Sequence, residues 1–325
     1  MLTRRAVVGG LATLGYPCIS SVGTAETQVG GIETLIVPFA AGGPADVAAR
    51  KLAPVMSERL QRKVIIENRA GAGGVTGLAA VVASKADGRT IGFATVGPLA
   101  MAPHMLPNVP FDPARDIAYI GLIAKVSELV VVSSAMPVRS FGEFLGYARH
   151  NPGKVTIGST GTGGIAHLAI ELLKSKAGID VVHVPYRGAA PALVDVMAGQ
   201  VNAMIADISI FIGQANSDKL RPLALAGDKR SPLMPDVPTA TEAGLPGYKV
   251  ENWYGFIAPK DTPAEEQTLL NVALNVAVSD PDVVRSFNDL GAVAIGGTPA
   301  EFRDFALQEY ARWGGIIRDA GIKIN

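Results

Sequence analysis

Two glycine-rich loops contain the residues of this chain that are best suited to bind a small anion. They are PFAAGGPADVAAR (Pro38–Arg50) and GSTGTGGIAH (Gly158–His167), and each lies between a strand pattern and a helix pattern. The first turn of a helix leaves backbone N–H groups unpaired and carries partial positive charge. A carboxylate or phosphate can therefore bind there without a lysine.

Polar side chains accompany the glycines in both loops. Asp46 lies in the first turn of the first predicted helix, where it can cap the amides or meet a donor on a ligand, and Arg50 can pair with it one turn later. In the second loop Ser159, Thr160 and Thr162 offer hydroxyls beside glycine amides that can wrap an anion. A plain strand–helix connector with an exposed ion pair is the alternative for the first loop.

Other candidates lie near the ends of the predicted strands. His167 falls in the first turn of the second helix, as a ligand contact or as a structural hydrogen-bonding residue, and Arg187 follows a strand. Asp207 closes the apolar run NAMIAD, where an acid can accept a hydrogen bond from a ligand hydroxyl or amine, or cap a helix. The cluster GAGGVTG (Gly71–Gly77) either lines the same cleft or permits tight strand–helix packing.

Residue patterns typical of catalysis are absent from the sequence. It has no G-x-S-x-G elbow, no Walker loop and no H-E-x-x-H, and its histidines lack the close spacing of a metal pair. We therefore predict binding without an enzymatic reaction, a cofactor or a metal. The alternative is a nucleotide-dependent enzyme, because Gly161-x-Gly163-x-x-Ala166 fits a dinucleotide fingerprint, although Asp180 precedes the next strand instead of ending it.

The first 25 residues have the order of a secretory signal. Arg4 and Arg5 precede a short apolar run, and small residues follow up to Ala25. The run is too short to span a bilayer, and its weak hydrophobicity suits a twin-arginine leader, with general secretion as the alternative. We expect cleavage near Ala25, which removes the single cysteine, Cys18, and leaves a periplasmic protein.

The overall charge argues against a nucleic-acid partner. The formal charges sum to +0 and aromatic residues make up 6% of the chain, without a basic stripe or a stacking platform. We expect a monomer without a nucleic-acid partner.

Apolar strand patterns alternate with helix patterns, which predicts an α/β fold with mostly parallel sheets flanked by helices. We expect two lobes, with crossings near Ile123–Val126 and Gly227–Thr239, and a cleft at the carboxyl ends of the strands. Strands are expected at residues 33–39, 63–69, 90–95, 122–133, 155–159, 181–186, 202–207 and 220–227. Helices are expected at residues 45–60, 75–85, 140–150, 165–177, 190–199, 264–278, 282–288 and 299–320.

Six motifs in the same order make the chain resemble the Bug family, the extracytoplasmic solute receptors of tripartite tricarboxylate transporters. The resemblance covers nearly all of the chain after the leader. The motifs are PFAAGGPADVAAR, GAGG, IGSTGTGGIAHLAIELL, VPYRGAAPALVDVMAGQV, MPDVPTATEAGLPGY and NWYGFIAPKDTP.

The resemblance implies a two-lobed flytrap receptor that closes on an organic acid, and we expect it to deliver the acid to a membrane permease. A sensory receptor that uses the same cleft is an alternative. The predicted crossings divide the chain into lobe 1, residues 26–124 and 236–325, and lobe 2, residues 125–235. Trp253 and Tyr254 are expected to form one wall. The ligand-binding residues that the resemblance implies are Phe39, Ala41, Gly42 and Asp46 from the first loop, Ser159, Thr160, Gly163 and His167 from the second, and Asp207 and Phe211 at the distal end of the ligand.

Overall fold

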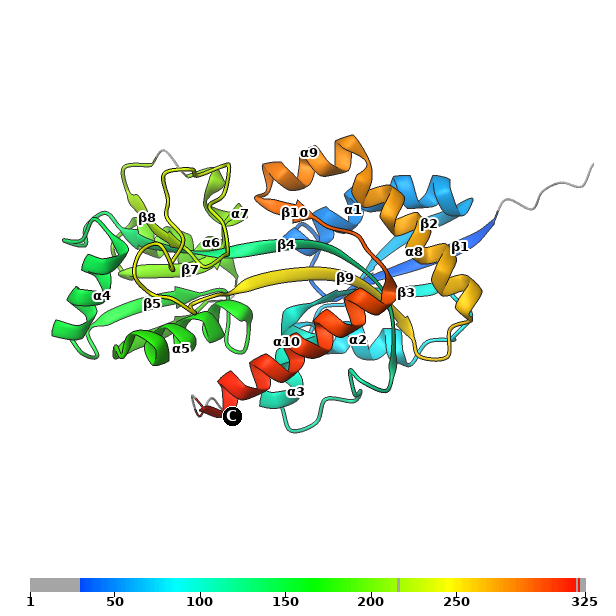
Figure 1. The fold of residues 1–325 in the computed structure, drawn as a ribbon, viewed down its shortest axis with the longest axis horizontal. Coiled ribbons are helices and arrows are strands. Elements are labelled where there is room, and N and C mark those ends of the chain that lie inside the picture. Colours follow the sequence, from blue (N-terminus) through cyan, green and yellow to red (C-terminus); the bar gives the residue numbers. More distant parts are fainter. Residues whose placement is uncertain (1–29, 187, 215–216, 320, 322–325) are drawn as a thin grey trace, which may run out of the picture.

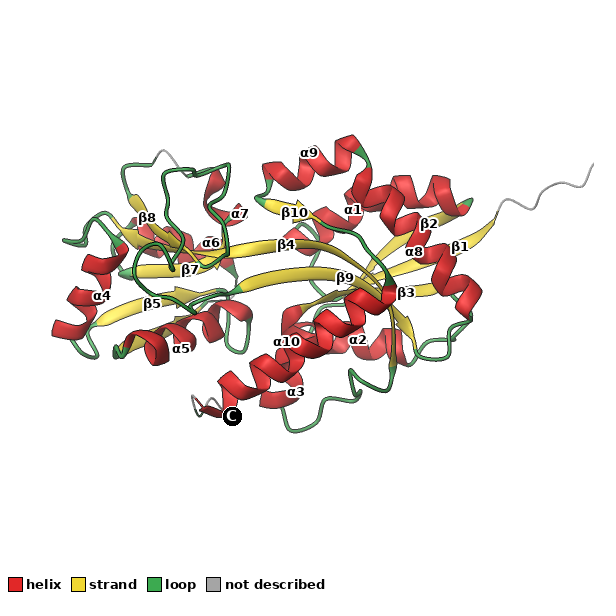
Figure 2. Ribbon diagram, viewed as in Figure 1, coloured by secondary structure: helices red, strands yellow, loops and turns green. Residues whose placement is uncertain are grey.

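The protein folds around one mixed β-sheet that runs through two halves, with helices on both faces (Figures 1 and 2). The computed structural model describes residues 30–186, 188–214, 217–319 and 321. The predicted leader and Arg187 lie outside the described residues. The α/β fold with helices on both faces of the sheet is confirmed.

The first half begins with parallel strands that alternate with helices. β1 pairs in parallel with β2 on one side and with β3 on the other, because a helix connects each strand to the next. The elements are β1 (Gly30–Val37), α1 (Pro44–Leu60), β2 (Arg62–Asn68), the 3₁₀ turn η1 (Ala72–Gly74), α2 (Val75–Val82), β3 (Thr90–Thr95), the π-helical turn η2 (Gly97–Met101) and α3 (Ala102–Met105).

The second half repeats this arrangement, with β5 parallel to both β6 and β7. The long strand that enters this half runs antiparallel to β7 and β8. The elements are β4 (Ile117–Ser133), α4 (Phe141–His150), β5 (Val155–Ser159), α5 (Ile165–Ala177), β6 (Val181–Pro185), α6 (Ala189–Met197), β7 (Ala203–Asp207), α7 (Ser209–Ile212) and β8 (Leu220–Leu225).

The C-terminal segment completes the first half. Its first strand inserts between β3 and β4 and is antiparallel to both, and its last short strand pairs with β4. The elements are β9 (Glu251–Pro259), α8 (Ala264–Ser279), α9 (Pro281–Asp289), β10 (Ala292–Ala294) and α10 (Pro299–Asp319). The sequence pattern did not predict β9 or β10, because prolines and glycines surround the first and the second has three residues.

β4 belongs to both halves of the sheet. Its first part pairs with β9 as far as Ser127, which lies opposite Glu251, and its second part pairs with β7 and β8 from Glu128 onward. At the junction Glu128 N–H donates to the carbonyl of Val250. The chain therefore crosses between the halves just after the predicted segment Ile123–Val126.

Contacts with the second half continue past the predicted return crossing at Gly227–Thr239. Residues up to Tyr248 still contact the second half: Ala240 N–H donates to the Leu225 carbonyl, and the Tyr248 hydroxyl donates to the Ala169 carbonyl. The segment contains no helix and no named strand, so the sequence carries no periodic signal for its position. The lobe boundaries stay a prediction, and these bonds favour assigning residues 236–250 to lobe 2.

Two hydrophobic cores cover the two faces of the sheet, and both extend along its two halves. β4 shows why, because Val130 and Val132 belong to one core and Leu129 and Val131 to the other. Helices α2, α4, α5 and α10 contribute buried residues to the first core, and α1, α6, α8 and α9 contribute to the second. The division into halves is thus a property of strand pairing and not of separate cores.

Candidate functional site

A cleft of about 1010 Å³ opens between the two halves, large enough for a small organic ligand. It lies at the carboxyl ends of β1, β3, β5, β6 and β7, as the sequence pattern predicted. Residues of β4 and β9 form its floor. Its described lining residues are Phe39–Ala45, Gly73, Thr95–Pro98, Glu128, Thr160–Thr162, Gly164–Ala166, Pro185, Tyr186, Gly188, Ala189, Ala206, Asp207, Ile210, Asn252 and Tyr254.

The first loop presents backbone to the cleft. Phe39, Ala41 and Gly42 all line it, and Gly42 has a φ of +83°, a value that strongly favours glycine. The helix that follows begins at Pro44, and within the described residues no side chain caps it at Gly43. The loop therefore leaves the partially positive end of α1 facing the cleft.

Asp46 supports this loop from behind and is not among the lining residues. Its buried carboxylate accepts hydrogen bonds from Gly42 N–H at 2.8 Å, from Arg50 Nε–H at 2.8 Å and from Asn68 Nδ2–H at 2.9 Å. These bonds lower the pKa of Asp46 to about 2, and the bond from Arg50 contributes most. The predicted pair with Arg50 is confirmed, and the carboxylate holds the loop conformation.

The third glycine cluster serves both purposes that the sequence left open. Gly73 lines the cleft, with a φ of +63°. A Cβ at Gly77 would lie 2.6 Å from Pro38, so that glycine allows α2 to pack against the chain leaving β1. The cluster both borders the cleft and packs under the first loop.

The second loop offers hydroxyls as well as backbone. Thr160, Gly161 and Thr162 line the cleft, followed by the first residues of α5. Within the described residues no side chain caps α5 at Gly164, so its N-terminal amides also face the cleft. Two helix N-termini from opposite halves thus open into one cleft.

Two stacked imidazoles lie behind the second loop. His167 and His183 have ring centroids 4.0 Å apart and an interplanar angle of 14°. Gly163 N–H donates to His167 Nδ1 at 3.1 Å, and the buried hydroxyl of Ser159 lies 2.6 Å from His183 Nε2. Ser159, Gly163 and His167 are therefore absent from the lining set, and they position Thr160 and Gly161.

Both histidines favour their neutral forms. Burial lowers the pKa of His167. Burial is also the main cause that lowers the pKa of His183 to about 4, and the charge of the neighbouring His167 is the second cause. A neutral His167 can accept the Gly163 N–H bond at Nδ1, whereas a protonated ring has no free acceptor there. The order of the second loop consequently depends on uncharged imidazoles.

The floor of the cleft is acidic. Glu128 of β4 and Asp207 of β7 are opposite each other in antiparallel register, 1% and 9% exposed, and both line the cleft. Asn252 and Tyr254 of β9 complete the floor. The sequence prediction included Asp207 but missed Glu128 and Asn252. A lone acid within the apolar run of β4 was the signal that could have identified Glu128.

The expected distal wall is only partly present in the cleft. Phe211 is 1% exposed and belongs to a hydrophobic core, while its neighbour Ile210 lines the cleft. Trp253 is buried against Phe302, whereas Tyr254 lines the cleft. Adjacent residues of a strand point to opposite faces, so one strand cannot place both aromatic rings in one wall.

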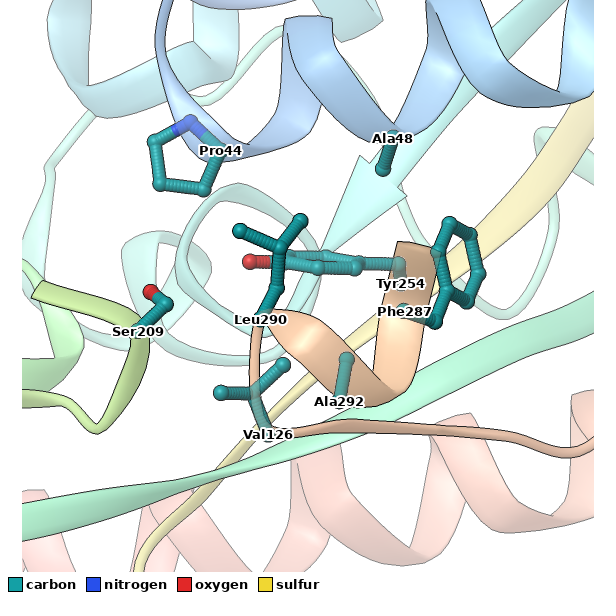
Figure 3. A pocket seen from close by; sticks show the side chains of 8 residues that line it. All are labelled: Pro44, Ala48, Val126, Ser209, Tyr254, Phe287, Leu290 and Ala292. Atoms are coloured by element: carbon teal, nitrogen blue, oxygen red, sulfur yellow. The ribbon is translucent and has the colours of Figure 1, made fainter. Parts of the chain in front are cut away.

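A second, much smaller cavity of about 20 Å³ lies beside the first loop (Figure 3). Pro44 and Ala48 of α1, Ser209 of α7 and Leu290 border it. Tyr254 lines this cavity as well as the cleft. The volume suffices for about one water molecule, so the cleft is the candidate ligand site.

The described residues contain no group of three or more metal-ligating side chains. Nor does any described helix combine the length and the apolar character needed to cross a membrane. Glu128 and Asp207 are the charged side chains among the described lining residues. A bound carboxylate would therefore meet amides and hydroxyls at the two loops.

Comparison with known proteins identifies the family. The model of the tripartite tricarboxylate transporter family receptor matches residues 48–322. Protein BugT of Bordetella pertussis (strain Tohama I) is 33% identical over 327 residues, which cover 100% of this chain and 99% of BugT. The chain therefore belongs to this receptor family, and the resemblance to the Bug proteins is confirmed.

Solved structures support the same assignment. The periplasmic binding protein BugD is 31% identical, with a TM-score of 0.80 and coverage of 90% of this chain and 99% of BugD. R. palustris Rpa4515, whose structure was determined with adipate, is 33% identical, with a TM-score of 0.83 and coverage of 90% and 99%. The chain is thus a solute-binding receptor with the fold of periplasmic binding proteins of this family.

Proposed function

We propose that this receptor captures a small organic carboxylate in the cleft between its halves and delivers it to the membrane subunits of a tripartite transporter. The observation that carries the proposal is the pair of helix N-termini, those of α1 and α5, that open into one cleft without side-chain caps among the described residues. Such ends bind anions through backbone N–H groups. The adipate in the related Rpa4515 structure supports a carboxylate as the solute.

In this proposal the predicted site residues have two roles. Phe39, Ala41, Gly42, Thr160 and Asp207 line the cleft and are available to contact the ligand. A second set shapes these loops from behind, and it consists of Asp46, Ser159, Gly163, His167 and Phe211. Closure of the halves would select the state that the membrane subunits recognise.

We also propose that the protein is a periplasmic monomer without catalytic activity, exported by the leader in residues 1–25. A mass measurement of protein purified from the periplasm would identify cleavage near Ala25, and light scattering would give the mass in solution. Retention of residues 1–25 would contradict the leader, and a dimer mass would contradict the monomer.

A thermal-shift screen tests the binding function. The protein without residues 1–25 is unfolded and refolded to remove any ligand carried through purification, and is then screened with mono-, di- and tricarboxylates, amino acids, NAD and ATP. A ligand that binds the folded state raises the melting temperature, and calorimetry then gives its Kd. A shift with at least one carboxylate is expected. A shift with NAD or ATP alone would favour the nucleotide-dependent alternative.

A further inference from the structure

The acidic floor of the cleft carries more hydrogen-bond acceptors than donors. Both carboxylate oxygens of Glu128, Oδ1 of Asp207 and Oδ1 of Asn252 are buried without a hydrogen-bond partner among the described residues. Asn252 Nδ2–H donates to Asp207 Oδ2 at 3.4 Å, and the Tyr254 hydroxyl also interacts with the Asp207 carboxyl. Buried polar atoms in native proteins are usually paired, so these oxygens point to a partner supplied from the cleft.

The two carboxyls interact with each other as well. Burial raises the pKa of Glu128 well above its usual range, with the charge of Asp207 as the next cause, and burial also raises the pKa of Asp207. A hydrogen bond between the two carboxyls uses one oxygen of each. The second oxygen of Glu128 and Oδ1 of Asn252 still lack a donor among the described residues.

The surroundings favour a positive or N–H-bearing group at this position. Among the described lining residues none carries a lysine, arginine or histidine side chain. A ligand carboxylate placed at the floor would face the acceptor oxygens of two acidic side chains, which is unfavourable in a buried site. An ammonium group has three donors and no acceptor, so it can bond to the oxygens that remain without a donor.

We propose that the floor binds a protonated amino group, so that the ligand is an amino carboxylate whose two ends are recognised separately. Its carboxylate meets the amides and hydroxyls of the two loops, and its ammonium meets Glu128 and Asp207. The inference rests on the proposed carboxylate-binding function and specifies the other end of the ligand. It sets this receptor apart from Rpa4515, whose structure was determined with the dicarboxylate adipate.

Matched ligands test the inference. 6-Aminohexanoate and adipate have chains of equal length and differ in one terminal group, as do 4-aminobutanoate and succinate. Calorimetry on the refolded protein should give at least about tenfold tighter binding for the amino acid of the better-fitting pair. Equal or tighter binding of the dicarboxylate in both pairs overturns the inference and leaves the proposed function standing. If no carboxylate of any class binds, the proposed function fails as well.

Substitutions at the floor provide a second test. Glu128→Gln and Asp207→Asn each preserve shape, and each should reduce the preference for the amino acid over the dicarboxylate by about tenfold or more. The control is Glu33→Gln, because Glu33 is also fully buried but pairs with Arg62 on β2, outside the cleft. An unchanged preference in folded Glu128→Gln and Asp207→Asn proteins, verified by their melting curves, overturns the inference.

Discussion

The two loops that face the cleft have similar backbone geometry but different chemical support. Behind the first loop, the carboxylate of Asp46 accepts bonds from Gly42, Arg50 and Asn68. Behind the second loop, the supports are two stacked imidazoles that contact Gly163 and Ser159. A buried carboxylate supports one loop, and neutral imidazole rings support the other.

Because of this difference, the support of the first loop tolerates acid better than the support of the second loop. The pKa of Asp46 is about 2, so its carboxylate stays ionised down to strongly acidic solution. The pKa of His183 is lowered to about 4 from the usual 6.5, so its neutral form is stabilised by folding. Below pH 6.5 the unfolded chain binds a proton that the folded chain lacks, and this contribution to stability is lost as the pH falls toward 4.

The largest effect is expected from Asp46→Ala. The substitution removes the acceptor of three hydrogen bonds, including one from a charged donor, each worth about 0.5–3 kcal/mol. We expect ligand affinity to fall by roughly 10- to 100-fold, measured by calorimetry with the best ligand from the thermal-shift screen. Affinity within twofold of the natural protein would show that the first loop does not need this support.

The second largest effect is expected from acidification, which should act on the second loop. Between pH 7 and pH 4.5 we expect the protection of the Gly161 and Gly163 amides against hydrogen exchange, measured relative to the intrinsic rate at each pH, to decrease, while the Gly42 amide stays protected. His183→Gln, which cannot be protonated, should remove most of the change. An equal loss of protection in both loops would contradict the proposed difference between their supports.

Local exchange is a better measurement here than total stability, because Glu33 acts in the opposite direction. Burial raises the pKa of Glu33 to about 7 despite the nearby Arg62. The folded chain then holds a proton that the unfolded chain releases above about pH 4.5, so this stabilising contribution is lost as the pH rises from about 4.5 to about 7. The Glu33→Gln variant removes this opposing slope from melting curves.

A smaller effect is expected from Thr160→Val. The change keeps the shape of the side chain and removes one hydroxyl from the cleft wall. Loss of one neutral hydrogen bond costs about 0.5–1.5 kcal/mol, which corresponds to an affinity decrease of roughly 2- to 10-fold. Thr162→Val is the matched variant in the same loop, and identical affinities for the natural protein and both variants would exclude a hydroxyl contact.

The smallest effect is expected from Arg50→Gln. The Arg50 side chain is 54% exposed, and exposed ion pairs contribute little because water and salt screen them. Calorimetry should give an affinity within about twofold of the natural protein. A loss as large as that in Asp46→Ala would mean that Arg50 and not the backbone amide of Gly42 is the important partner of the carboxylate.

The sequence predicted the elements with strong periodicity and the loops between them. The glycines of both loops and the apolar strands that precede them are local signals, and the structure has them at the expected positions. The floor of the cleft was harder to predict. Glu128 and Asn252 meet there because β4 and β9 pair over a separation of more than a hundred residues, which no local pattern specifies.

The sequence also could not predict whether a loop side chain points toward the cleft or away from it. Asp46 and His167 are each in the first turn of a helix, where a side chain can point toward a ligand or back toward the loop. The structure directs both back, because Gly42 N–H and Gly163 N–H provide donors there. Trp253 and Tyr254 show the same limit, since the pairing of β9 decides which ring faces the cleft.

The late position of β9 in the chain also determines the order in which the protein can fold. β3 and β4 are synthesised early, but their common neighbour in the sheet is Glu251–Pro259. The centre of the first half therefore cannot close until most of the chain has been made, whereas β5, β6 and β7 can pair as soon as residue 207 is available. Contacts over such long separations slow folding. A nascent chain that ends before residue 251 has a second half able to form and a first half that is still incomplete.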